Sequence, residues 1–128
     1  MSIPIAVTEL PGNTRMADAA LVVVAFCANW CGTCREFRPV LERIANARPE
    51  ILFAWADIED HAELVGDIDV ENFPSLAVFR AGSVLHYGVS LPHEAVVARM
   101  VDALSAQPPA RAADAPPEVR ALAERISR

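Results

Sequence analysis

Two cysteines separated by two residues, Cys31 and Cys34, are the residues of this sequence best suited to chemistry. A thiolate attacks a disulfide sulfur, and a second thiol within reach displaces the captured partner by closing an intramolecular disulfide. Residues three apart on a helix have Cβ atoms about 5–6 Å apart, which is near enough for that second step. The spacing therefore predicts thiol–disulfide exchange, with Cys31 attacking and Cys34 resolving.

The flanking sequence places this pair where a strand meets a helix. Residues 21–26 are continuously apolar and rich in Val, which predicts a strand buried on both faces. Apolar residues then recur with helical spacing at Phe37, Val40, Leu41 and Ile44. Cys31 would open this helix, where free backbone N–H groups and the helix dipole favour an anion, so we expect its thiolate to form readily.

Three other interpretations of the cysteines are weaker. A structural pair of core cysteines would not need a Trp-Cys-Gly turn at the start of a helix. Zinc takes four ligands, and the three histidines are scattered through other segments, so we expect no metal site. Counting Cys27 gives a spacing similar to the cluster motif of radical SAM enzymes, but 128 residues can hardly supply their large barrel. We therefore interpret Cys27 as a small buried hydrophobic residue that ends the strand.

Composition limits the class of protein. A chain of 128 residues makes one domain, large enough for a core without disulfide staples. The net charge of −6, with eleven Arg and no Lys, provides no basic patch for nucleic acid. No apolar run is long enough to span a bilayer, and the first residues lack the positive region of a signal peptide. We expect a monomeric, cytoplasmic protein that binds neither nucleic acid nor membrane.

Strand and helix patterns alternate over residues 1–105, which predicts one α/β domain. Residues 51–56 form a second strand, parallel to the first because a helix connects the two. Residues 75–79 and 84–87 form an antiparallel hairpin at the edge of the sheet, and a helix near residue 105 closes the domain. A Pro/Ala-rich linker at 106–117 then leads to a short C-terminal helix at 118–128.

The pattern over about residues 5–105 resembles the thioredoxin family. The residues that carry the resemblance are Phe26, Ala28, Trp30, Cys31, Gly32, Cys34, Pro39, Asp57, Ile58, Glu59, Phe73, Pro74, Ser75 and Gly82. The resemblance implies a thioredoxin fold, a central mixed β-sheet flanked by helices, here with a short C-terminal extension. It also implies a protein-disulfide oxidoreductase whose nucleophile is Cys31, whose resolving thiol is Cys34, and whose redox group is the Cys31–Cys34 disulfide, with no cofactor.

The same resemblance implies a substrate surface and partners. Trp30, Gly32, Thr33, Phe73 and Pro74 would contact the substrate, with Pro74 in the cis form beside the cysteines. The expected partners are disulfide-containing proteins and a thioredoxin reductase, in electron transport and cell redox homeostasis.

Several positions depart from the family pattern. Thioredoxins usually carry a buried Asp and a Lys where this sequence has Ala25 and Trp55, so we expect slower resolution by Cys34. Asp57 and Glu59 are the only nearby acids, and we expect both to face solvent. Thr33 stands where thioredoxins have Pro, which would shift the pair toward a more oxidising potential.

A second family offers an alternative function. Parts of the sequence also resemble thioredoxin-like chaperones of hydrogenase maturation, which commonly lack the Cys pair. The alternative is therefore a binding module for a partner protein with little redox turnover. The intact Cys31 and Cys34 favour the enzyme.

Overall fold

The protein forms one mixed five-stranded sheet with helices on both faces. The computed structural model describes residues 4–16, 19–28, 31–65, 68, 70, 74–80, 83–89, 93–106 and 115–126. The strands are β1 (Ile5–Ala6), β2 (Leu21–Cys27), β3 (Ile51–Asp57), β4 (Ser75–Arg80) and β5 (Ser83–Val89). The helices are α1 (Gly32–Asn46), α2 (Ala62–Val65), α3 (Glu94–Ala106) and α4 (Pro117–Ile126), and two 3₁₀ turns, η1 (Val7–Glu9) and η2 (Thr14–Met16), precede β2.

The strand order is β1-β3-β2-β4-β5. β2 runs parallel to β3 along its whole length, from Leu21 opposite Ile51 to Cys27 opposite Asp57. β4 is antiparallel to both β2 and β5. The predicted parallel crossover and the antiparallel edge hairpin are therefore confirmed.

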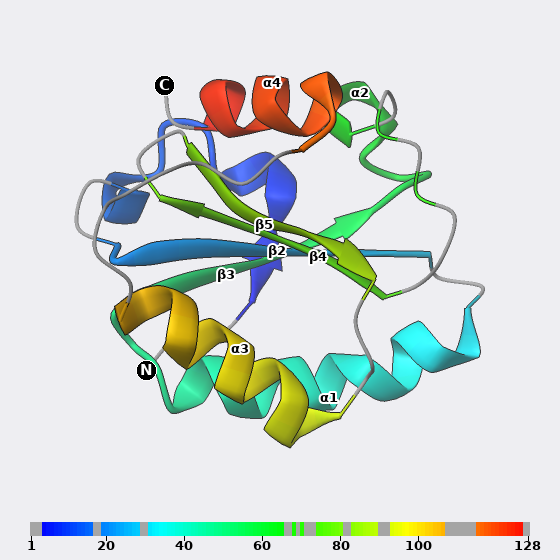
Figure 1. Ribbon diagram of the computed structural model, residues 1–128. Coiled ribbons are helices and arrows are strands. Elements are labelled where there is room, and N and C mark those ends of the chain that lie inside the picture. The colour runs from blue at the N-terminus through cyan, green and yellow to red at the C-terminus, as the bar shows by residue number, and fades with distance from the viewer. Residues whose placement is uncertain are drawn as a thin grey trace.

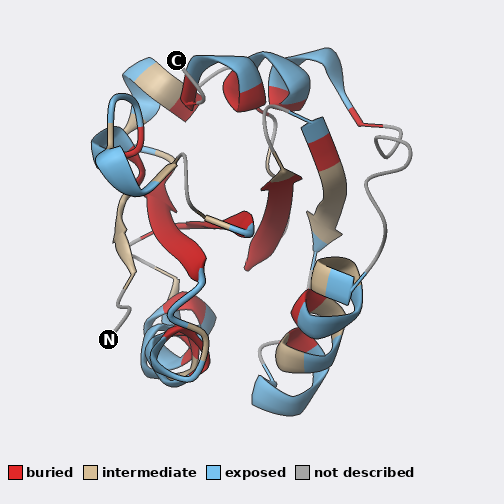
Figure 2. Ribbon diagram, turned by 90° about the vertical axis from the view of Figure 1, so that its left-hand side faces the viewer, coloured by how far each residue is buried: buried red, intermediate tan, exposed pale blue. Residues whose placement is uncertain are grey.

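Alternate residues of the central strands point to opposite faces of the sheet, and both faces are buried. Figure 1 shows α1 and α3 on one side, here named the α1 face, and α2 and α4 on the other side, the α4 face. Val22, Val24 and Phe26 belong to the core of the α4 face, whereas Leu21, Val23, Ala25 and Cys27 belong to that of the α1 face. The buried strands lie between outer helices whose outward surfaces are exposed (Figure 2). This placement explains why residues 21–27 are apolar without alternation.

The C-terminal helix is part of this core. Its buried residues are Val119, Leu122, Ala123 and Ile126, the same apolar stripe that the sequence predicts for residues 118–128. They belong to the same cluster as the β2 and β3 residues of the α4 face, and α4 packs on β5. Val7 of η1 and Val65 of α2 belong to the same cluster, and α4 adds to the cover over apolar strand residues that would otherwise meet water.

Two ion pairs connect α3 to α1 and to the residues that follow α1. The guanidinium of Arg48 donates two hydrogen bonds to the carboxylate of Asp102, of 2.8 and 2.9 Å, and Arg43 bonds Glu94 at 2.7 Å. The hydrogen bond with Arg48 lowers the pKa of Asp102, and the same bond raises the pKa of Arg48.

Among the described residues, no helix has both the length and the apolar character to cross a membrane.

Candidate functional site

Cys31 occupies the N-cap position of α1. Its backbone is extended (φ −85°, ψ 118°), and its amide donates a 3.0 Å hydrogen bond to the carbonyl of Ala28, which closes a turn between the end of β2 and the helix. The residue is partly exposed and carries a free thiol. Gly32 and Thr33, which follow it, are exposed. Cys31 is therefore partly accessible, beside the amide groups that begin the helix.

Cys34 lies one turn further into α1 and is buried. It shares its helix face with Phe37, Leu41 and Ile44, which pack on the sheet, and only 1% of its surface is exposed. Cys34 is therefore a core residue, whereas Cys31 is partly exposed and packs against the edge of the same core. The two expected catalytic cysteines lie three residues apart on α1 but in different environments.

The disulfide in the structure joins Cys34 to Cys27, with Cα atoms 5.7 Å apart, and not to Cys31. This differs from the expected Cys31–Cys34 disulfide, and the interpretation of Cys27 as only a buried hydrophobic residue is wrong in this respect. Cys27 is fully buried, as expected, but its side chain lies on the α1 face, directly under the inward stripe of α1. Because Cys34 belongs to that stripe, the two sulfurs meet between helix and sheet.

A signal in the sequence could have identified this pairing. Cys27 is an even number of residues from Leu21, Val23 and Ala25, so these four residues share one face of the strand. Cys34 lies at i−3 from Phe37, so it extends the buried stripe of the helix. The two periodicities together direct both thiols into the same interface.

The positions that depart from the family pattern lie beside this interface. Ala25 is fully buried and stands in register with Trp55 of β3. The guanidinium of Arg38 on α1 lies 5.1 Å from the centroid of the Trp55 ring, in a cation–π contact. Ala25 belongs to the same core cluster as Cys27 and Cys34, so position 25 provides no ionisable side chain in the core that holds these two cysteines.

Asp57 is buried, so the expectation that it faces solvent is wrong, whereas Glu59 is exposed as expected. Burial is tolerated because Asp57 Oδ1 accepts hydrogen bonds of 2.9 Å from the amides of Glu59 and Asp60. The backbone N–H of Asp57 donates to Nδ1 of His61 at 2.9 Å. Asp57 thus holds the turn that follows β3, and it stands in register with Cys27 at the end of the two strands.

Pro74 is buried immediately before β4. Ser75 pairs with Phe26, so Pro74 lies at the same end of the sheet as Cys27. The cis form of Pro74 stays a prediction. Trp30 and Phe73, the other expected substrate-contact residues, lie outside the described part of the chain.

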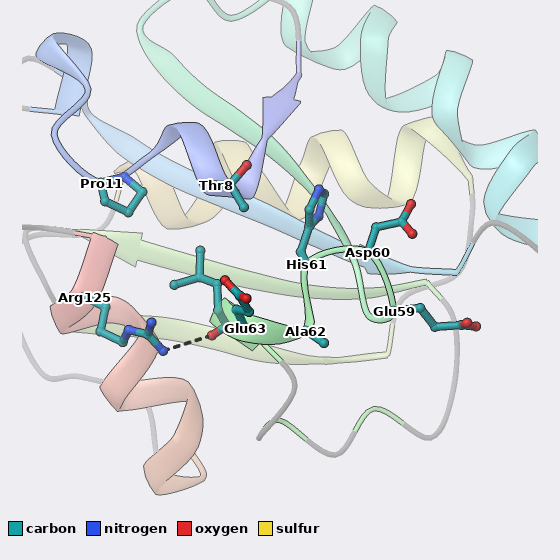
Figure 3. Close-up of a pocket in the computed structure, with 9 residues that line it drawn as sticks. Thr8, Pro11, Glu59, Asp60, His61, Ala62, Glu63 and Arg125 are labelled. Atoms are coloured by element: carbon teal, nitrogen blue, oxygen red, sulfur yellow. Dashed lines mark hydrogen bonds between the residues drawn. The ribbon is translucent and has the colours of Figure 1, made fainter.

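A separate pocket of about 470 Å³ lies between η1, α2 and α4. Figure 3 shows Arg125 of α4 beside this pocket, where its Nη1 donates a 3.4 Å hydrogen bond to the carbonyl of Leu64. None of the site residues expected from the sequence lines it.

Over the described ranges, no three His, Cys, Asp or Glu side chains are grouped to hold a metal ion.

Comparisons with known proteins place this site in a family context. A family model described as Thioredoxin matches residues 8–102. The chain is 31% identical over 80 residues to "Putative thioredoxin 2" of Streptomyces coelicolor, a stretch that covers 62% of this chain and 60% of that protein. It is 33% identical over 89 residues to protein disulfide-isomerase A4 of Homo sapiens, covering 66% of this chain and 14% of that protein. The matched region thus spans less than two thirds of the length of either relative.

A solved structure agrees with the fold. A mutant thioredoxin from Halobacterium salinarum NRC-1 matches with a TM-score of 0.69 and 27% identity, covering 85% of this chain and 98% of that chain.

Proposed function

Because the chain belongs to the thioredoxin family, we propose that it is a thiol–disulfide oxidoreductase that reduces protein disulfides, with Cys31 as the attacking thiol. The observation that carries this proposal is the free, partly exposed thiol of Cys31 at the N-cap of α1. There, the thiol lies beside the first backbone amides of the helix, and a substrate sulfur can approach from solvent.

The reaction has two exchange steps. The Cys31 thiolate attacks one sulfur of a substrate disulfide, which forms a mixed disulfide and releases the other substrate thiolate. In the fully reduced protein, in which Cys27 and Cys34 are both thiols, the Cys34 thiol one helical turn away then attacks the Cys31 sulfur and releases the second substrate thiol. Two electrons pass to the substrate, and a Cys31–Cys34 disulfide forms without a bound cofactor.

The substrate surface that we propose surrounds this sulfur. Gly32 and Thr33 are exposed beside it, and Pro74 lies at the same end of the sheet. Together with Trp30 and Phe73 they would hold an extended substrate segment by backbone hydrogen bonds. Disulfide-containing proteins are the substrates, and a thioredoxin reductase would restore the dithiol. A reducing compartment such as the cytoplasm suits a pair that must be returned to the dithiol form.

The alternative function, a binding module without redox turnover, is not favoured. Such a module has no need of an accessible thiol beside a buried cysteine pair.

Trapping of mixed disulfides tests the proposal. Cys34→Ser removes the resolving thiol, so it should accumulate a covalent complex with insulin that dithiothreitol releases. Cys31→Ser is the matched control and should form no complex, because its remaining cysteines are buried. Non-reducing electrophoresis and intact mass measure both. Equal trapping by the two variants would show that Cys31 is not the attacking thiol.

A further inference from the structure

Three cysteines within eight residues form one connected set, and Cys34 is its central member. Cys34 is bonded to Cys27 across the interface between α1 and the sheet. It also lies one helical turn from Cys31, whose side chain packs against the same core cluster. Cys34 therefore has two neighbouring sulfurs, one buried and one partly exposed.

The bonded pair is shielded from external reagents. Cys27 has 0% and Cys34 has 1% of its surface exposed, whereas Cys31 is partly exposed. Thiol–disulfide exchange requires the attacking sulfur to reach the disulfide, so access limits its rate. A buried Cys27–Cys34 disulfide is therefore formed and broken most readily through Cys31, the sulfur of the set that solvent reaches.

We propose that Cys27 is a third redox thiol, which takes the disulfide over from Cys31 and leaves Cys31 free in the oxidised protein. This rests on the proposed function, because the Cys31–Cys34 disulfide formed in turnover is its starting point. The Cys27 sulfur attacks the Cys34 sulfur, the Cys31–Cys34 bond breaks, and a Cys27–Cys34 bond forms. The proton lost by the Cys27 thiol is balanced by the one that Cys31 gains, so the step is an isomerisation and needs no oxidant.

The oxidised protein then differs from one with a single cysteine pair. Its Cys31 thiol can attack a second disulfide, but Cys34 is occupied and cannot release that partner. Recovery runs in reverse: Cys31 attacks Cys34, Cys27 regains its thiol, and an external dithiol reduces the Cys31–Cys34 bond. When the disulfide lies between Cys27 and Cys34, the partly exposed Cys31 thiol is thus free to bind one partner covalently.

Each possible disulfide among the three cysteines leaves one free thiol, so a count of free thiols does not distinguish Cys27–Cys34 from Cys31–Cys34. Peptide mapping identifies which cysteines are bonded. Chymotrypsin cleaves after Phe26 and Trp30, and trypsin cleaves after Arg35, which puts Cys27 on one peptide and Cys31 with Cys34 on the next. The fully reduced protein is treated with one equivalent of oxidised glutathione, quenched in acid, alkylated and digested. We expect the two peptides to be linked by a disulfide, with the alkyl group on Cys31.

A glutathionylation assay provides a second readout. With excess oxidised glutathione, the wild-type protein should retain one glutathionyl group on Cys31. The matched Cys27→Ala variant should retain none, because its Cys31 and Cys34 close a disulfide with each other. Circular dichroism establishes that this variant is folded.

Two results would overturn the proposal. An alkyl group on Cys27, with the disulfide inside the Cys31–Cys34 peptide, would show that the disulfide stays at Cys31. A linked peptide that survives dithiothreitol in the folded protein would show that Cys27–Cys34 is a permanent structural disulfide. Failure of the proposed function is distinct, because Cys34→Ser would then form no mixed disulfide at Cys31 with any disulfide probe.

Discussion

Replacement of Leu122 in α4 by Ala tests whether the C-terminal helix is an integral part of the fold. Leu122 has 1% of its surface exposed and belongs to the core cluster of the α4 face. The change removes three buried carbons, which at about 0.8 kcal/mol each corresponds to roughly 2.4 kcal/mol of lost transfer free energy. The cavity left behind adds to this, and buried Leu→Ala changes cost about 2–5 kcal/mol in general.

We expect the free energy of unfolding to fall by about 3 kcal/mol, because an outer helix such as α4 can shift and fill part of the cavity. For a domain of this size, that corresponds to a decrease in Tm of roughly 10 °C. Urea unfolding followed by circular dichroism measures the change, with both proteins in the same cysteine redox state. The slope with urea should stay constant while the midpoint falls.

Glu124→Ala is the matched control, because Glu124 lies on the exposed side of the same helix. We expect it to change the free energy of unfolding by less than about 0.5 kcal/mol. If Leu122→Ala is no more destabilising than this control, then α4 does not pack on the sheet in solution.

Three further substitutions probe the site, one ion pair and a partly buried histidine. Ala25→Asp should raise the rate of insulin reduction near neutral pH, because it supplies a proton acceptor beside the cysteines; an unchanged rate would show that proton transfer is not limiting. Asp102→Asn should cost about 1 kcal/mol or less near neutral pH, because this carboxylate is largely exposed. Arg48 lowers the pKa of Asp102, so this difference should disappear in urea unfolding as the pH falls below 3.8 through the lowered value. Burial lowers the pKa of His86 below 6.5, so its contribution to stability is complete above 6.5 and is lost as the pH falls through the lowered value. His86→Leu should flatten that part of the pH–stability curve, and the exposed His93→Leu should leave it in place.

The sequence by itself determined the main elements and the face that each one buries. The unbroken apolar run at 21–26 required a strand covered on both sides, and the 3.6-residue spacing after Cys34 required a helix packed on it. The link through a helix required the next strand to be parallel. The stripe in residues 118–128 likewise identified a helix with one buried side. These signals are periodic patterns of neighbouring residues, so they can be recognised in the sequence without the tertiary structure.

Only the tertiary structure determined which side chains from different helices, strands and turns contact one another. The sequence shows Cys31 and Cys34 as neighbours, but distance along the chain does not show that the first is partly exposed and the second is buried against the sheet. Cys27 pairs with Cys34 because α1 packs on the face of β2 that carries Cys27. The pairing depends on which face of the strand Cys27 occupies and on which side of the helix Cys34 occupies. Asp57 is buried for a similar reason: the turn after β3 brings two backbone amides to its carboxylate, and no local pattern encodes that approach.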